Sequence, residues 1–223
     1  MINKPQLVIF DMDGTMLDTE SLLLQGMEVV AKNQNIVLPI DFVYKMIGRN
    51  RAHARKLAKD ELGDAFDFDK GMKDYHLFKE NHYAAHGIPV KKGLFNLLDT
   101  LEKLNIEKCV ATSTDKKAAE SKLERTNILH CFKVVVGGDE VTESKPNPEI
   151  FLKAAALSGF KPEDCLIIED SPAGCLGAKN AGIKCILVPD VAPLNETDKS
   201  NAFVVKNCLD EVAEYILSIP SLG

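Results

Sequence analysis

Two acidic residues follow the first apolar run of the chain. Residues 7–10 are Leu, Val, Ile and Phe, and Asp11 and Asp13 come directly after them, with Gly14 next. Side chains two residues apart point the same way while the backbone stays extended, and glycine then allows a sharp turn. Asp and Gly are also common in ordinary turns. Other parts of the sequence are therefore needed to distinguish a catalytic site from a turn.

Polar residues also follow three later apolar runs. Thr112, Ser113 and Thr114 come directly after residues 109–111, and Glu169 and Asp170 come directly after residues 165–168. Ser144 and Lys145 lie between the run 132–136 and the next helical pattern. Taken singly, each group has a plain explanation as a turn, a solvated lysine or a helix cap. If these groups lie together, their hard carboxylate oxygens suit Mg²⁺. Hydroxyl groups, a lysine and a carboxylate-bound Mg²⁺ around one point suit a phosphoryl group.

The elements that must bring these residues together are short apolar runs alternating with amphipathic segments. We expect strands at 7–10, 109–111, 132–136, 165–168 and 185–188, with a further strand at 202–205. Helical patterns lie between them, for example the leucines at three- and four-residue spacing in 94–104. This alternation predicts an α/β fold with a doubly wound parallel sheet covered on both faces. The carboxyl ends of such strands are where these sheets bind ligands.

One long segment interrupts the alternation. Between about residue 19 and residue 86 helical patterns dominate, at 22–30, 41–47, 52–62 and 69–83. This is too long for a loop of a compact sheet domain. We therefore predict a core domain made of residues 1–18 and 87–223, and a helical cap domain made of residues 19–86.

Four segments resemble the four motifs of the haloacid dehalogenase superfamily, in the right order along the chain. They are D-M-D-G-T-M-L-D at 11–18, the serine of V-A-T-S-T at 110–114, S-K-P-N-P at 144–148 and E-D-S at 169–171. The helical insertion is similar to the first cap type of this superfamily. The subgroup that the chain resembles holds β-phosphoglucomutase and related sugar-phosphate phosphatases, and the resemblance covers nearly the whole chain.

The resemblance implies a role for each motif residue. Asp11 is expected to be the nucleophile, which forms an aspartyl-phosphate, and Asp13 the general acid and base. The expected Mg²⁺ ligands are the Asp11 and Asp170 carboxylates and the Asp13 carbonyl oxygen, with Glu169 acting directly or through a metal-bound water. Ser113 and Lys145, with the neighbouring hydroxyl of Thr114, are expected to hold the phosphoryl oxygens.

Weaker signals lie in the predicted cap. The segment Gly48, Arg49, Asn50 and Arg51 resembles the substrate-specificity loop of the superfamily. Arg49 or Arg51 could clamp a second anionic group of a substrate, or both could be solvated residues at a helix start. Thr19 and Glu20 stand at the predicted hinge, where Glu20 faces the substrate or caps the next helix. The histidines of the cap show no ligand spacing and are expected at the surface.

The expected function is Mg²⁺-dependent hydrolysis of a small phosphate monoester such as a sugar phosphate. A phosphomutase is the alternative, but β-phosphoglucomutases carry a histidine on the first cap helix where this chain has Leu23. A haloalkanoate dehalogenase is disfavoured by Asp13, because that class lacks the second aspartate. A non-catalytic binding protein would be expected to have lost Asp11, Asp13 or Lys145.

The composition of the chain limits the kinds of binding partner that we expect. The chain has 33 acidic and 27 basic residues and no block of like charges, so we expect no nucleic-acid partner. No apolar segment approaches the roughly 20 residues that span a bilayer. A cytoplasmic enzyme acting on a small phosphorylated metabolite is therefore expected, and since nothing demands an oligomer, a monomer.

Overall fold

Six strands form one parallel sheet in the computed structural model, which describes residues 3–47 and 49–220. In chain order the strands are β1 Leu7–Phe10, β2 Glu107–Ala111, β3 Val134–Val136, β4 Cys165–Glu169, β5 Lys184–Leu187 and β6 Val204–Val205. Their order across the sheet is β3-β2-β1-β4-β5-β6. The strand order reverses at β1, which pairs with β2 on one side and β4 on the other. Ligands bind at such a reversal in doubly wound sheets.

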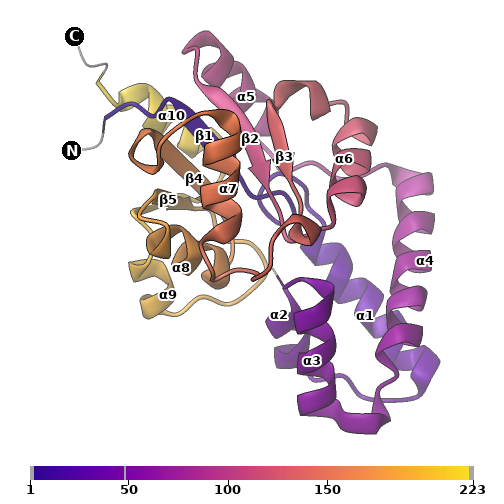
Figure 1. Ribbon diagram of the computed structural model, residues 1–223. Helices are drawn as coiled ribbons and strands as arrows, with labels where there is room; N and C mark the ends of the chain where they lie inside the picture. Colours follow the sequence, from indigo (N-terminus) through magenta and orange to yellow (C-terminus); the bar gives the residue numbers. More distant parts are fainter. Residues whose placement is uncertain (1–2, 48, 221–223) are drawn as a thin grey trace.

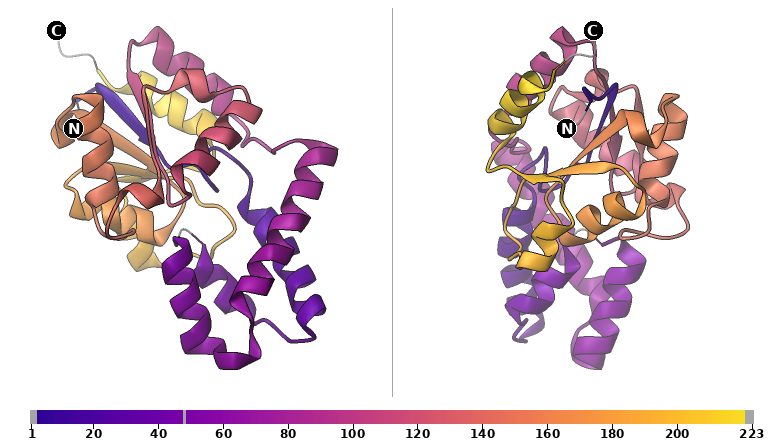
Figure 2. Two further views of the ribbon diagram at one scale, coloured as in Figure 1. Left: turned by 45° about the vertical axis from the view of Figure 1, so that its right-hand side comes forward. Right: turned by 90° about the vertical axis from the view of Figure 1, so that its left-hand side faces the viewer.

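Helices cover both faces of this sheet, because alternate residues of the buried strands point to opposite sides. In β1, Val8 and Phe10 face a core built with α5, α6 and α10, whereas Leu7 and Ile9 face a core built with α7 and α8. These helices are α5 Leu94–Lys103, α6 Lys116–Arg125, α7 Glu149–Ser158, α8 Pro172–Asn180 and α10 Leu209–Ser218, while the short α9 spans Glu196–Ser200. The two views of Figure 2 show the layers on either side of the sheet.

The remaining helices gather beside the sheet and lie at the lower right of Figure 1. They are α1 Glu20–Gln34, α2 Ile40–Met46, α3 Arg51–Leu62 and α4 Phe68–His86. They bury a small core of their own, in which the rings of Phe42 and Phe68 each meet Phe66 edge to face, at centroid distances of 6.0 and 6.3 Å. All four helices fall within residues 19–86, the segment that we call the cap. The division into core and cap domains stays a prediction.

The two chain segments that join cap and core run side by side. Leu17 and Val90 form an antiparallel bridge. The Asp18 amide donates to the Pro89 carbonyl at 2.9 Å, and the Lys91 amide donates to the Met16 carbonyl at 2.9 Å. Lys91 also holds Asp18 through an ion pair of 3.3 Å. These contacts tie both linkers together close to Asp11 and Asp13.

The predicted doubly wound parallel α/β sheet is confirmed, and the strand ends differ from the predicted ones by at most two residues. The third strand begins at Val134 and not at Phe132, because Phe132 follows a 3₁₀ turn at Leu129–Cys131 and turns its ring onto Phe10, 5.7 Å away. Among the described residues, no helix has the length and apolar character needed to cross a membrane.

Candidate active site

Asp11 lies where β1 leaves the sheet. Its amide donates to the Ile168 carbonyl at 3.0 Å, which holds the residue against the end of β4. Gly14 has a φ of +87°, a conformation that an L-residue rarely adopts. A Cβ at Gly14 would also overlap the carboxyl group of Asp170. The glycine of the first motif therefore allows both the turn and the close approach of the first and fourth motifs.

Lys145 is the buried cation of the site. Its ammonium group binds Asp11 Oδ1, Glu169 Oε1 at 2.7 Å and the Ala111 carbonyl at 3.2 Å, and its side chain is 2% exposed. Burial raises the pKa of Asp11 to about 7, although Lys145 acts in the opposite direction. Burial opposes the charge on Lys145 too, but Asp11 and Glu169 together raise its pKa. Lys145 thus offsets negative charge at the point where the sequence predicted a phosphate contact.

Glu169 is fully buried, and both of its carboxylate oxygens have partners. Oε1 accepts from Lys145, while Oε2 accepts from the amides of Asp170 and Ser171 and from the Ser171 hydroxyl, each at 2.9 Å. This geometry makes Glu169 a positioning residue for Lys145 and for the turn that carries Asp170. The direct or water-mediated metal contact expected of Glu169 stays a prediction.

Asp170 has an oxygen that suits a cation. Its Oδ1 accepts from the Thr15 hydroxyl at 2.8 Å, whereas its Oδ2 is buried without a hydrogen-bond partner. Burial, followed by the charge of Glu20, raises the pKa of Asp170. Asp11, Glu169 and Asp170 each offer an oxygen within 4.8 Å of the others. A hard divalent cation such as Mg²⁺ fits this set of oxygen donors and would satisfy the unpaired oxygen.

Asp13 makes contacts that the sequence did not reveal. Its carboxylate accepts from Thr19 at 2.6 Å, from Thr114 at 2.7 Å and from the ammonium group of Lys122 at 2.6 Å. Burial opposes ionisation, but Lys122 and the two hydroxyl groups together lower the pKa of Asp13 to about 2. Asp13 is therefore a carboxylate at neutral pH, the form that can accept a proton.

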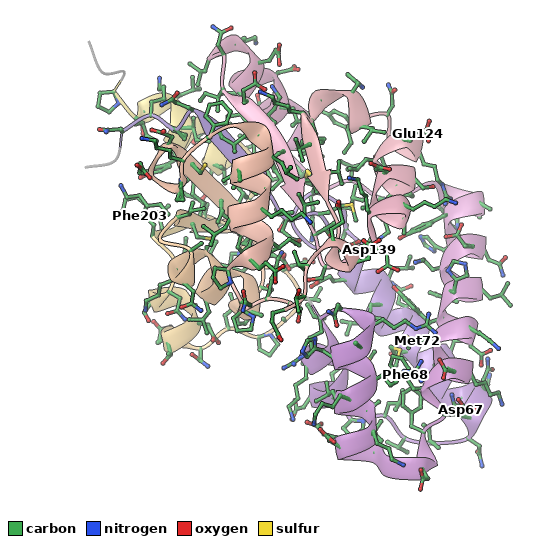
Figure 3. All side chains as sticks on the ribbon, viewed as in Figure 1. Asp67, Phe68, Met72, Glu124, Asp139 and Phe203 are labelled. Atoms are coloured by element: carbon green, nitrogen blue, oxygen red, sulfur yellow. The ribbon has the colours of Figure 1, made fainter. Side chains whose placement is uncertain are left out.

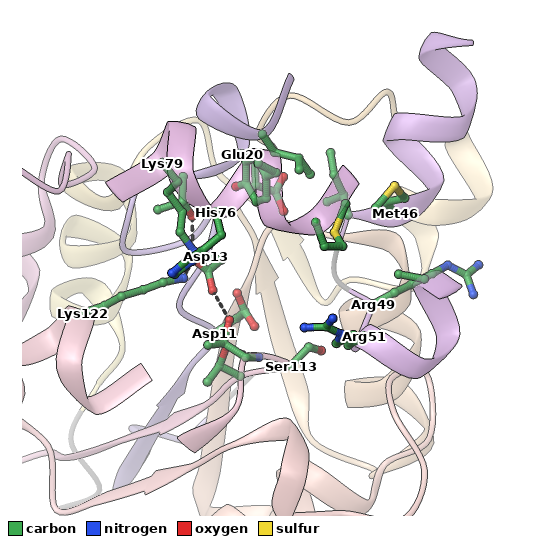
Figure 4. A pocket seen from close by; sticks show the side chains of 18 of the residues that line it. Asp11, Asp13, Glu20, Met46, Arg49, Arg51, His76, Lys79, Ser113 and Lys122 are labelled. Carbon is green, nitrogen blue, oxygen red and sulfur yellow. Dashed lines mark hydrogen bonds and ion pairs between the residues drawn. The ribbon is translucent and has the colours of Figure 1, made fainter. Parts of the chain in front are cut away.

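The three residues after β2, Thr112 to Thr114, have different contacts. Ser113 lines the pocket beside Asp11, as Figure 4 shows. Thr114 also lines it, but its hydroxyl donates to Asp13, so in this structure it supports the predicted acid and base. Thr112, which is buried, accepts from the Thr114 amide at 3.2 Å and so fixes this turn.

The pocket lies between core and cap and has a volume of about 350 Å³. Asp11, Asp13 and Ser113 form its core side, and Arg49 and Arg51 lie opposite (Figure 4). Phe68 and Met72, which lie among the cap helices in Figure 3, also line it. The volume falls in the range of small-molecule sites.

Only some of the described residues of the predicted specificity segment, 48–51, line the pocket. Arg49 and Arg51 line it, although Arg49 Nε donates to the Lys45 carbonyl at 2.7 Å and Arg51 pairs with Asp69 at 3.1 Å. Asn50 does not line it; its side chain caps α3 by accepting from the His53 amide at 3.0 Å. Gly48 lies outside the described residues.

The hinge residues Thr19 and Glu20 both line the pocket. Glu20 does not act as the helix cap, because it is the first residue of α1 and Thr19 occupies the cap position without a side-chain bond. The carboxyl group of Glu20 is buried near Asp170, where burial and then Asp190 raise its pKa to about 9.

Several pocket residues were missed by sequence reasoning: Lys122 from α6, and Tyr75, His76, Lys79 and Tyr83 from α4. Lys122 and Lys79 lie in charged helical segments that resemble ordinary solvated faces, so the sequence carried no signal for them. His53 was expected at the surface, but it is half-buried and within 2.9 Å of the Ser144 hydroxyl across the boundary of cap and core.

The sequence of the chain is similar to those of known phosphatases. The family model described as "Haloacid dehalogenase-like hydrolase" matches residues 8–188. A (DL)-glycerol-3-phosphatase of Arabidopsis thaliana is 32% identical over 82% of this chain and 79% of the relative. A phosphorylated carbohydrates phosphatase of Thermotoga maritima is 30% identical over 80% of this chain and 82% of its own length.

The fold has a solved counterpart in β-phosphoglucomutase from Clostridium difficile. That structure has a TM-score of 0.77, is 23% identical in sequence, and the match covers 97% of this chain and 96% of the other. The likeness concerns the fold alone. Together with the match over residues 8–188, it confirms the resemblance that the four motifs indicated. The chain belongs to the haloacid dehalogenase-like hydrolase family.

Proposed function

We propose that this enzyme is a Mg²⁺-dependent phosphatase that hydrolyses a small phosphate monoester through an aspartyl-phosphate on Asp11. The observation that carries the proposal is the placement of Asp11. Its carboxylate lines the pocket between core and cap, is bound to the buried Lys145, and lies near the carboxylate of Asp170, whose Oδ2 is unpaired. An anionic nucleophile and an anionic substrate repel each other, and this arrangement offsets the repulsion.

The first half of the reaction forms a bond between an Asp11 oxygen and phosphorus and breaks the bond to the alcohol oxygen of the substrate. The departing alkoxide needs a proton, which Asp13 donates in its acid form. Asp13 is ionised in the present structure, where Lys122 contacts it. A phosphate dianion bound nearby raises the pKa of a carboxyl group, so proton uptake by Asp13 accompanies substrate binding.

The second half reverses the roles. A water molecule attacks phosphorus, the bond from phosphorus to Asp11 breaks, and Asp13 accepts the proton that the water loses. The Asp13 carboxyl group accepts from Thr19, Thr114 and Lys122, which favour its ionised form, and this form suits the step. Inorganic phosphate leaves, Asp13 releases the proton taken from water to the solvent, and Asp11 and Asp13 return to their starting states.

Mg²⁺ would be held by the carboxylates of Asp11 and Asp170 and by the backbone carbonyl of Asp13. It supplies positive charge that lowers the repulsion between nucleophile and phosphate. Ser113 and Lys145 are proposed to bind the phosphoryl oxygens, and Glu169 to hold Lys145 in place. The unpaired Oδ2 of Asp170 supports the metal site.

A small phosphorylated carbohydrate or polyol is the proposed substrate class. The printed names of two relatives, a glycerol-3-phosphatase and a phosphorylated carbohydrates phosphatase, support it. The pocket volume of about 350 Å³ suits such a molecule. On the cap side Lys79 lines the pocket, where burial and then the charge of Lys122 lower its pKa, and Arg51 is a second cation. These cations suit a polar or anionic leaving group.

Hydrolysis is favoured over phosphoryl transfer to a second sugar hydroxyl. Leu23 lines the pocket from α1. An apolar side chain cannot join a proton-transfer network there.

The test is a set of phosphate release assays with Mg²⁺, using glycerol phosphate, hexose and pentose phosphates and phosphoglycolate as substrates. The wild-type chain should release phosphate from at least one of them. Asp11→Asn should remove that activity, whereas Asp115→Asn, a change at an exposed aspartate, should retain it. Equal phosphate release by Asp11→Asn and the wild type would refute the assignment of the nucleophile.

A further inference from the structure

A second group of buried acids lies next to the proposed catalytic centre. It consists of Glu20 at the start of the first cap helix, Asp170 after β4 and Asp190 in the loop after β5. Each offers a carboxylate oxygen within 4.8 Å of the other two. The side chain of Asp190 is 9% exposed, and Glu20 and Asp170 are 5% and 2% exposed. Three carboxyl groups from distant parts of the chain thus converge in a space shielded from water.

One carboxylate oxygen of each of these acids lacks a hydrogen-bond partner. Glu20 Oε2, Asp170 Oδ2 and Asp190 Oδ2 are all buried without a hydrogen-bond donor. The other oxygens of the two aspartates are occupied, since Asp170 Oδ1 accepts from Thr15 and Asp190 Oδ1 from Lys91. A buried acceptor without a partner is unfavourable, and more so when it is charged. Even with Mg²⁺ bound to Asp170 in the catalytic site, Glu20 Oε2 and Asp190 Oδ2 would stay unpaired, so a cation between the three acids would be stabilising.

The lysines near the cluster do not bind these unpaired oxygens. Lys91 approaches Asp190 through Oδ1 and its other partner is Asp18. Lys145 contacts Asp11, Glu169 and a carbonyl oxygen. Because residue 14 is glycine, the carboxyl groups of Asp170 and Glu20 can both approach its backbone, where a Cβ would overlap them.

We propose that Glu20, Asp170 and Asp190 form a second divalent-cation site, which shares Asp170 with the catalytic Mg²⁺ site. Three carboxylate oxygens without an imidazole or thiolate suit a hard cation such as Mg²⁺, Mn²⁺ or Ca²⁺. No step of the proposed hydrolysis needs this ion, so the site goes beyond the proposed function.

The position of the site gives it a structural role. Glu20 belongs to α1 of the cap, whereas Asp170 and Asp190 belong to the core, so a cation there links the two directly. Lys91, on the second linker, is already bound to Asp190. An ion in this site therefore holds both linkers and the start of α1 against the end of the sheet, and cap position becomes dependent on metal binding.

The alternative occupant is a proton on Glu20. Burial and then Asp190 raise the pKa of Glu20 to about 9, so in the absence of a cation Glu20 is protonated at neutral pH. A proton can serve only one hydrogen bond between two of the three carboxyl groups, whereas a cation binds all three. Counting bound metal ions separates the two occupants.

The experiment is a titration of the full chain with Mn²⁺ at neutral pH, with free Mn²⁺ measured by electron paramagnetic resonance. Two Mn²⁺ ions are expected to bind per wild-type chain. Asp190→Asn and Glu20→Gln should each lose the second ion or bind it at least about tenfold more weakly. Asp99→Asn, a change at an exposed acid on α5, is the matched control and should still bind two.

One Mn²⁺ per wild-type chain would overturn the second site while leaving the proposed function intact. A second ion that binds with unchanged affinity in either variant would also overturn it, because the ion would then lie elsewhere. Binding of no Mn²⁺ at all would contradict the proposed function as well. If one variant does not fold, as judged by circular dichroism, the wild-type stoichiometry and the other variant decide.

Discussion

Replacement of Lys122 by methionine removes the ammonium group that contacts Asp13 and keeps most of the apolar stem. The two side chains are 12% and 25% exposed, and their charged atoms are 2.6 Å apart, so solvent screens this pair only in part. Burial disfavours the charged form of Asp13, and Lys122 is the largest influence in the opposite direction. The variant therefore leaves a half-buried carboxylate without its cation.

The size of the effect follows from the pKa of Asp13. Its lowering from 3.8 to about 2, at about 1.4 kcal/mol per pKa unit, corresponds to roughly 2 kcal/mol of folding free energy. Because the folded-state pKa is the lower one, this stability is present above the unfolded pKa near 4 and is lost as pH falls through about 2. Lys122 is the largest of the groups that lower this pKa, so Lys122→Met should lower the free energy of unfolding by an amount of this order, about 2 kcal/mol, between about pH 5 and pH 8.

The assay is urea unfolding of the metal-free chain at several pH values, with Lys116→Met as control. Lys116 lies on the same helix and pairs with Glu140 at 3.3 Å, but its side chain is 39% exposed, so its loss should cost less than about 1 kcal/mol. In kinetics, the acidic limb of the pH–rate profile should move to higher pH in Lys122→Met, because burial then raises the pKa of Asp13. Equal destabilisation by both variants, or a Lys122 effect that grows below about pH 4, would refute the reasoning.

Two further predictions concern the metal and the reaction type. Asp170→Asn should lose at least about tenfold in Mg²⁺ affinity and lose phosphatase activity, as should the wild type in excess chelator; full activity in the chelator would contradict the metal site. With β-glucose 1-phosphate, catalytic glucose 1,6-bisphosphate and Mg²⁺, the enzyme should release phosphate or remain inactive, because Leu23 lines the pocket. Rapid formation of glucose 6-phosphate without comparable phosphate release would show a mutase instead.

The fold and the centre of the site were predictable because both depend on local sequence. Each motif follows an apolar run of a few residues, and a parallel sheet brings the carboxyl ends of its strands to one edge. Asp11 and Glu169 therefore lie together although they are far apart in the chain: Phe10 and Ile168, which precede them, are paired in register. Lys145 lies with them for the same reason, since its loop follows β3 at the same edge.

Lys122 and Lys79, which reach the site from helices, were not predictable in this way. Lys122 lies in the charged segment Lys116–Arg125, whose composition is that of a solvated helix, and its contact with Asp13 depends on how α6 packs. Lys79 on α4 depends in the same way on where the cap lies against the core. Asp190 did carry a signal, because it follows β5 and Pro189 at the same edge, but a single acid after a strand is also an ordinary loop residue.

The central claim is that phosphate passes through a covalent bond to Asp11, and a trapping experiment tests it most directly. The enzyme is mixed with its best substrate and Mg²⁺, quenched in acid within one turnover, digested at low pH and analysed by mass spectrometry. We expect phosphate on the peptide that contains Asp11, and none there in the Asp11→Asn variant. Phosphate on a different residue would contradict the account, as would single-turnover phosphate release with no trapped phosphate on Asp11 at any quench time.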